Sequence, residues 1–227
     1  MQKYQINKNF FDKIDSMEKA YFLGLIFSDG HHQEERNMIR IYLQETDKEI
    51  LIKLNNLIQP EKPLYISDRK EKEPTFQTQF GLVIQNKHIS KKMLEYYCFQ
   101  NKTESLKFPN FLKDDLIWHF IRGFFDGDGH IGTLSNSSRI VICGTLDFCS
   151  DLKKILNNNL IKCSVYKQKN IWKLGISNKH DIYKFCDLIY KNKGELFLER
   201  KYKRYLEFFN EYKKWIFTNE KRNPRKY

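Results

Sequence analysis

The sequence has few cysteines, no long apolar stretch and a shortage of acidic residues. Its five cysteines form no C-x-x-C pair, which argues against a zinc site or a disulfide framework and favours reduced thiols. No apolar run approaches the roughly 20 residues that a membrane-spanning helix needs. The first residues, Met1-Gln2-Lys3-Tyr4, lack the apolar segment of a signal peptide. We therefore expect an intracellular protein, in the cytoplasm or in an organelle such as a mitochondrion or chloroplast, with no membrane partner.

The charge balance is strongly basic. Lysine and arginine together number 40 against 28 aspartates and glutamates, so the formal net charge is +12. A surplus of this size favours a polyanionic partner, with nucleic acid ahead of a membrane surface. With 227 residues, of which 41% are hydrophobic and 15% aromatic, the chain can bury the core of one or two domains.

A ten-residue pattern occurs twice. The first copy, at 22–31, reads FLGLIFSDGH, and the second, at 121–130, reads IRGFFDGDGH. Each is an apolar run that ends in an acid, a glycine and a histidine, and the two acids, Asp29 and Asp128, lie 99 positions apart. A duplicated buried segment with one carboxylate per copy predicts two half-domains that face a shared site.

The same order of elements follows each copy: a helix carrying the pattern, a strand, a helix, two strands and a helix. We expect N-terminal caps at Ser16, Asn86, Thr145 and Asn178, and a capping box formed by Thr46 with Glu49. The predicted organisation is an N-terminal lead-in at 1–16, a first half-domain at 17–100, a linker at 101–113, a second half-domain at 114–212 and a basic C-terminal tail at 213–227.

Small residues recur at a spacing of four within each pattern. On a helix, this spacing places two small side chains on one face, where another helix can approach closely. The predicted interface of the motif helices contains Gly24, Ser28, Gly123 and Gly127. Such packing would bring Asp29 and Asp128 side by side at the ends of their helices.

Two adjacent carboxylates at helix C-termini repel each other and the partial negative charge there, and a divalent cation resolves both problems. Hard oxygen ligands favour Mg²⁺, for which Mn²⁺ is expected to substitute, over Zn²⁺. Carboxylates, a hard metal and a basic protein together predict hydrolysis of phosphodiester bonds.

Both patterns resemble the LAGLIDADG motif, and residues 17–210 resemble the single-chain, two-motif LAGLIDADG homing endonucleases. The second copy is a close match, whereas the first departs from the motif at Phe27. The resemblance implies an α+β fold of two αββαββα half-domains related by a pseudo-twofold axis, whose antiparallel sheets form a saddle on DNA. It implies a monomer that acts as a pseudo-dimer in intron homing and makes a double-strand cut at a long, specific DNA site.

The resemblance also implies roles for individual residues. Asp29 and Asp128 would be catalytic and bind the metal, with Gly30 and Gly129 included in the metal site, while Asp126 is expected to be structural. Lysines near the scissile phosphates would be Lys107 and Lys201, with Lys102 and Lys193 as rival candidates. Gln44 is a loose match to a residue that orders water, and we expect Cys143 to be its counterpart in the second half.

Polar residues on the predicted strands are candidates for DNA contacts, although solvated sheet faces look the same in sequence. Arginine and glutamine suit base readout, whereas lysine suits phosphate. The predicted contacts are Arg40, Tyr42, Gln77, Gln79, Arg139, Lys167, Lys169 and Lys173.

Two other functions are compatible with this resemblance. One is an RNA-splicing cofactor (maturase) that binds intron RNA with the same basic sheets. The other is a DNA-binding regulator that has lost the chemistry. The presence of both Asp29 and Asp128 favours the endonuclease, because a pure nucleic-acid binder has no need of paired acids.

Overall fold

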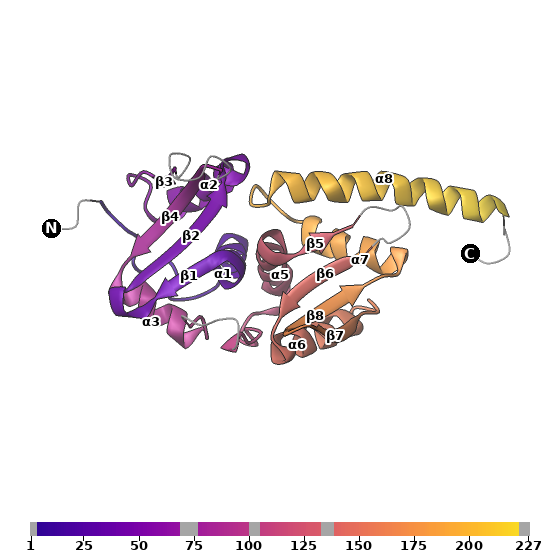
Figure 1. Ribbon diagram of the computed structural model, residues 1–227, viewed down its shortest axis with the longest axis horizontal. Helices are drawn as coiled ribbons and strands as arrows, with labels where there is room; N and C mark the ends of the chain where they lie inside the picture. Colours follow the sequence, from indigo (N-terminus) through magenta and orange to yellow (C-terminus); the bar gives the residue numbers. More distant parts are fainter. Residues whose placement is uncertain (1–3, 69–76, 100–104, 133–138, 223–227) are drawn as a thin grey trace. The chain divides into compact units, whose positions relative to one another are not determined.

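The computed structural model describes residues 4–68, 77–99, 105–132 and 139–222. Contacts divide the chain into two compact units, residues 1–128 with 193–198 and residues 129–192 with 199–227. Each unit combines helices with one four-stranded antiparallel sheet (Figure 1). The predicted α+β class is confirmed. No helix in the described part of the chain is long and apolar enough to cross a membrane.

The first unit contains one sheet, with strand order β1-β2-β4-β3. Its elements are α1 (Met17–Asp29), β1 (Gly30–Gln33), β2 (Met38–Gln44), α2 (Lys48–Ile58), β3 (Tyr65–Ser67), β4 (Gln79–Gln85), α3 (Lys87–Glu95) and α5 (Asp114–Asp128). The sequence repeat starts the second half-domain with α5, but by contact this helix belongs to the first unit. The reason is that α5 packs along α1.

The second unit repeats the same sheet topology, with strand order β5-β6-β8-β7. Its elements are β5 (His130–Ile131), β6 (Ile140–Gly144), α6 (Leu146–Asn158), β7 (Ser164–Gln168), β8 (Ile171–Ile176), α7 (Lys179–Tyr190) and α8 (Glu199–Arg222). The matching strand orders confirm the internal repeat that was predicted from the sequence.

Strand β2 has one buried and one open face. Ile39, Ile41 and Leu43 are buried, on the side where α2 and α3 pack against the sheet. Because side chains alternate along a strand, Arg40 and Tyr42 lie on the opposite face. The sheet therefore has an apolar side that builds the core and a polar side that is open to a partner.

Most of the predicted helix caps are present. The Asn86 side chain accepts hydrogen bonds from two amides of the first turn of α3, and Asn178 does the same for α7. Thr145 caps α6, with a distance of 3.1 Å from its Oγ1 to the Phe148 nitrogen. The predicted capping box at Thr46 is wrong, because a short 3₁₀ turn precedes α2 and its N-cap, Asp47, makes no side-chain cap bond.

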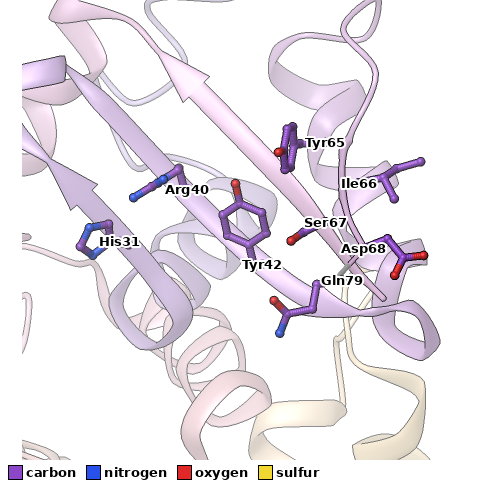
Figure 2. A pocket seen from close by; sticks show the side chains of 8 residues that line it. All are labelled: His31, Arg40, Tyr42, Tyr65, Ile66, Ser67, Asp68 and Gln79. Atoms are coloured by element: carbon purple, nitrogen blue, oxygen red, sulfur yellow. The ribbon is translucent and has the colours of Figure 1, made fainter. Parts of the chain in front are cut away.

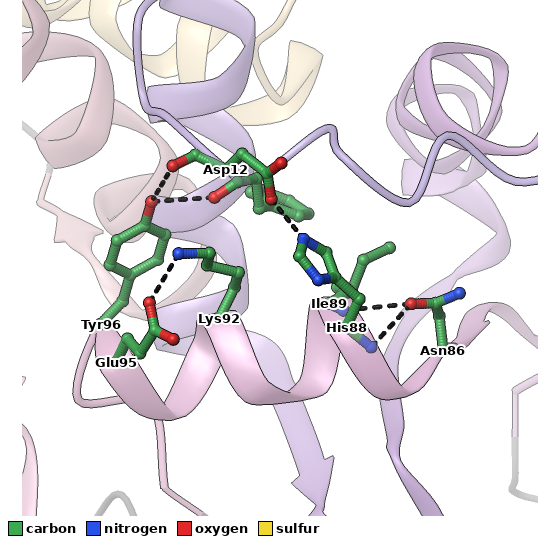
Figure 3. Close-up of polar contacts among 8 residues, drawn as sticks. Asp12, Asn86, His88, Ile89, Lys92, Glu95 and Tyr96 are labelled. Atoms are coloured by element: carbon green, nitrogen blue, oxygen red, sulfur yellow. Dashed lines mark hydrogen bonds and ion pairs between the residues drawn. The ribbon is translucent and has the colours of Figure 1, made fainter.

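The N-terminal lead-in belongs to the core of the first unit. The Phe11 ring is fully buried and lies 5.3 Å from the Phe22 ring, centroid to centroid. Polar contacts fasten the same segment to α3: Asp12 pairs with His88, and the Tyr96 hydroxyl donates to the Phe11 carbonyl at 2.8 Å (Figure 3). The segment is thus part of the folded unit, although the sequence indicated only a lead-in.

Two further boundaries differ from the prediction. In the described part of the predicted linker, Phe108 is buried and packs edge to face on Phe120 at 5.4 Å. The predicted tail is helical as far as Arg222, because α8 continues without a break. Along α8, the Tyr212 and Trp215 rings stack 6.0 Å apart, so aromatic packing spans the predicted boundary.

Candidate active site and nucleic-acid face

The two motif helices, α1 and α5, cross at their glycines. A methyl group on Gly24 would lie 2.8 Å from the Phe124 nitrogen, and one on Gly123 would lie 3.0 Å from the Leu25 nitrogen. Each glycine therefore faces backbone of the opposite helix, at matching positions of the two copies. Only a residue without a side chain allows this approach, as the spacing of small residues predicted.

The same reciprocal contact continues to the ends of the helices. A methyl group on Gly127 would collide with the Ser28 hydroxyl and the Asp29 carboxylate. The Ser28 hydroxyl donates to the Leu25 carbonyl at 3.2 Å and lies equally close to Asp29 Oδ2. The Asp29 carboxylate is thus packed against the residue that precedes Asp128. Asp29 is half-buried, whereas Asp128 is exposed.

The donor groups at this point suit a hard divalent cation. Among the described residues, no group of three or more histidine, cysteine, aspartate and glutamate side chains could hold a metal. Within the described ranges, the side-chain oxygens at the ends of the two motif helices are those of Ser28, Asp29 and Asp128. Mg²⁺ is commonly held by one or two carboxylates together with water and substrate phosphates, so Asp29 and Asp128 fit such an ion when a nucleic acid supplies the rest.

The glycines after the acids can contribute only backbone groups. The Gly30 amide donates to the Ile26 carbonyl and ends α1. The Gly129 carbonyl accepts a hydrogen bond of 2.7 Å from Lys201 Nζ. A carbonyl oxygen has two lone pairs, so Gly129 retains capacity for one further partner. Its inclusion in a metal site remains a prediction.

Asp126 has a structural environment, as expected. It is fully buried and accepts hydrogen bonds of 2.9 Å from the Tyr21 hydroxyl and from the Leu198 amide. Burial is the main cause that raises the pKa of Tyr21 well above its usual value, and the negative charge of Asp126 adds to it. The Tyr21 hydroxyl therefore keeps its proton and remains a hydrogen-bond donor. In the first copy this position is Phe27, whose ring packs on Phe120 at 5.2 Å.

Arg122, inside the second motif, is buried beside Asp126. Its guanidinium donates to the Leu196 carbonyl at 3.0 Å and to the Lys193 carbonyl at 3.1 Å. Together, Arg122 and Asp126 attach the segment 193–198 to α5. Nothing in the sequence indicated this attachment, because the segment lies about 70 residues further along the chain.

The candidate lysines differ in their surroundings. Lys201 is buried at 6% exposure, in a hollow of about 220 Å³ that Arg200, Arg204 and His130 also line. Lys107 is exposed between two buried neighbours. The two arginines around Lys201 were missed, although their spacing of four in a basic stretch is a signal for one helical face.

Of the rival candidates, Lys193 is half-buried, with its ammonium 3.8 Å from the centroid of the Phe197 ring. Lys102 lies outside the described residues. Gln44 is exposed at the end of β2. The strand register shows that the expected counterpart of Gln44 is wrong. His31 pairs with Arg40 and His130 with Val141, so Arg40 and Val141 are equivalent. Four positions further along, Gln44 therefore corresponds to Thr145 and not to Cys143.

The open face of the first sheet brings several predicted DNA contacts together. Arg40, Tyr42 and Gln79 line a hollow of about 570 Å³, which Figure 2 shows from close by. Gln77 is exposed just before β4. Sequence reasoning missed Tyr65, which also lines the hollow. Its ring lies edge to face with Tyr42 at 6.1 Å.

The second sheet divides its predicted contacts between two faces. Lys173 lies across from Tyr166 on one face and donates to the Gln168 side chain at 2.8 Å. Lys167 is directly opposite Trp172, so strand alternation places it on the other face, apart from Lys173. Lys169 occupies the tight turn between the strands with a φ of 54°. Arg139 is exposed just before β6.

Residues 115–190 match the sequence profile of the LAGLIDADG-like domain. The resemblance to the LAGLIDADG homing endonucleases is thereby confirmed for this part of the chain. A comparison with curated protein sequences finds no match.

Solved structures extend the fold similarity over most of the chain. The meganuclease I-SmaMI bound to DNA has a TM-score of 0.61 at 12% identity, over 88% of this chain and 92% of that one. The homing endonuclease I-WcaI bound to its recognition sequence has a TM-score of 0.56 at 15% identity, over 85% and 88%. The N-terminal LAGLIDADG domain of DUF199/WhiA has a TM-score of 0.53 at 18% identity, over 81% of this chain and 89% of that one.

Proposed function

We propose that the protein is a site-specific endonuclease that hydrolyses both strands of a DNA target with a divalent metal held by Asp29 and Asp128. The observation that carries this proposal is the packing of the Asp29 carboxylate against Gly127, directly before Asp128. Two helices in backbone contact hold these ends together, and a divalent cation would relieve the repulsion between the two carboxylates.

The rest of the molecule suits a DNA substrate. The net charge of +12 supplies attraction to phosphates, and the open sheet face offers donors and acceptors for base edges. Lys201, Arg200 and Arg204 surround the hollow next to Gly129, where they would neutralise a phosphate. When bound, Mg²⁺ would supply charge neutralisation and an activated water at the scissile phosphate, while Asp29 and Asp128 would orient it.

The proposal is tested with a plasmid library of random targets incubated with Mg²⁺, Mn²⁺ or EDTA. Linearised plasmids are sequenced to recover the target, and Asp29→Asn and Asp128→Asn are then compared on it. Because metal catalysis contributes several kcal/mol, each variant should cleave at least about 100-fold more slowly while it still retards the target in a gel. Asp115→Asn is the matched control: it removes the same charge from an exposed position at the other end of α5.

A DNA-binding regulator of the same fold is the second candidate, and the match to DUF199/WhiA favours it. Specific binding without cleavage under any metal condition would establish it and refute the endonuclease. A maturase would instead promote splicing of an intron RNA, and Asp29→Asn would leave that splicing unchanged.

A further inference from the structure

Arg40 lies on the open face of the first sheet, on the inner strand β2. Register places it between His31 on β1 and Val83 on β4, and Figure 2 shows it beside Tyr42 at the edge of the 570 Å³ hollow. Both neighbours on β2, Ile39 and Ile41, point into the core. The arginine therefore belongs to the surface that would meet a ligand, not to the interior.

No polar contact among the described residues holds the Arg40 side chain in place. Within the described part of the chain, Arg40 makes no side-chain hydrogen bond or ion pair, and its Nε is buried without a partner. A shielded N–H without an acceptor costs free energy. A ligand that offers two acceptors side by side would recover that cost, because the planar guanidinium presents its donors as a fork.

The surroundings of Arg40 give this fork a fixed setting. The Tyr42 ring covers Gly81, where a methyl group would lie 2.9 Å from ring carbon Cδ1, and Tyr65 packs against Tyr42 at nearly a right angle. Two tyrosines thus form a wall of the hollow that the missing side chain of Gly81 makes possible. Gln79 completes the hollow with an amide that both donates and accepts.

We propose that Arg40 reads a guanine in the target DNA and sets the base preference at one position. This inference rests on the proposed binding of DNA by the sheet face. In the major groove, guanine presents O6 and N7 as adjacent acceptors, the pair that an arginine fork recognises. A good bidentate contact of this kind discriminates against other bases by about 5- to 150-fold.

The second sheet has no arginine at the equivalent position. Its position equivalent to Arg40 is Val141, which pairs with His130 as Arg40 pairs with His31. A valine cannot hydrogen-bond a base and offers only apolar contact, which suits a thymine methyl group. The target is therefore asymmetric: a guanine is specified where Arg40 binds, and the equivalent position of the other half carries no such requirement.

The test selects bound duplexes from a random DNA library with Ca²⁺ in place of Mg²⁺, so that the readout does not depend on cleavage. The native chain should enrich sequences with one invariant guanine. Arg40→Gln should change the preference at that position from guanine to adenine, because glutamine matches adenine N6 and N7. Arg40→Lys, which keeps the charge and loses the fork, should reduce the guanine preference. Val141→Arg should create a second guanine preference elsewhere.

Arg36→Gln is the matched control, since it removes the same charge from an exposed turn and should leave every base preference unchanged. If Arg40→Gln weakens all sequences equally, Arg40 is a phosphate contact and the inference is wrong. Cleavage of a target with no guanine dependence would also refute the inference, while the proposed endonuclease would stand. Enrichment of the guanine motif without cleavage under Mg²⁺ would support the inference and refute the endonuclease.

Discussion

The crossing of α1 and α5 predicts an unusual response to a small substitution. In an exposed helix, replacing glycine by alanine stabilises by about 1 kcal/mol. Gly24→Ala instead places a methyl group 2.8 Å from the Phe124 nitrogen. The obstructing atoms belong to the backbone, so no side chain can rotate away, and overpacking of this kind costs about 1–3 kcal/mol. We expect the upper end of that range and a net destabilisation of about 1–2 kcal/mol.

The expected loss is measurable by calorimetry and by urea unfolding. For a chain of this size, 1 kcal/mol corresponds to about 2–4 °C in Tm, so Gly24→Ala should unfold about 2–8 °C below the native protein. Gly123→Ala should behave alike because its contact is the reciprocal one. The double variant should cost less than the sum, since the first methyl already separates the helices.

Gly175→Ala provides the control for adding a methyl group. Its nearest neighbour would be Cε1 of Tyr166 at 3.0 Å, the end of a side chain that can move, so little change in stability is expected. An increase in Tm for Gly24→Ala would refute the close contact of the helices. If the endonuclease proposal holds, the folded Gly24→Ala protein should also lose about 100-fold in cleavage, because a displacement near 1 Å at a catalytic group has that effect.

Two further predictions concern stability alone. Burial is the main cause that lowers the pKa of His119 to about 4, and the charge of Arg122 adds to it. Between pH 6.5 and 4 the unfolded chain therefore binds more protons than the folded protein. As the pH falls through that window, the free energy of unfolding should decrease by up to about 2 kcal/mol, after a discount for the partial exposure of His119. His119→Gln should abolish this pH dependence in urea unfolding. Asn86→Ala and Asn178→Ala should each cost about 1 kcal/mol in the same assay, because both caps serve two amides.

Local signals allowed much of the fold to be predicted. The caps at Asn86 and Asn178, the alternation along β2 and the spacing of Gly24 with Ser28 each depend on residues within one element. The structure bears them out because the local preference and the tertiary contact agree. The duplicated pattern added the one long-range fact, namely that α1 and α5 form a pair.

The features that sequence reasoning missed depend on contacts between distant segments. Alternation along a single strand is readable from the sequence. The register between β7 and β8, which places Lys167 and Lys173 on opposite faces of the sheet, is fixed only by the pairing of these two strands. The burial of Lys201 follows from its bond to Gly129, 72 residues away. The start of α2 was missed because a 3₁₀ turn replaced the capping box expected at Thr46.

The difference between the two motif copies has a physical cause. A buried backbone amide needs an acceptor, and the Leu198 amide finds one in Asp126. The corresponding position in the first copy, Phe27, packs on the Phe120 ring instead.

Two hydrogen bonds flank the start of α8. Leu198 binds Asp126, and Lys201, three positions later, binds Gly129, which is three positions after Asp126. The Lys201 bond thus joins the first turn of α8 to the residue that precedes β5 within the second unit. Asp126, the acid expected to be structural, therefore holds the residue that directly precedes α8.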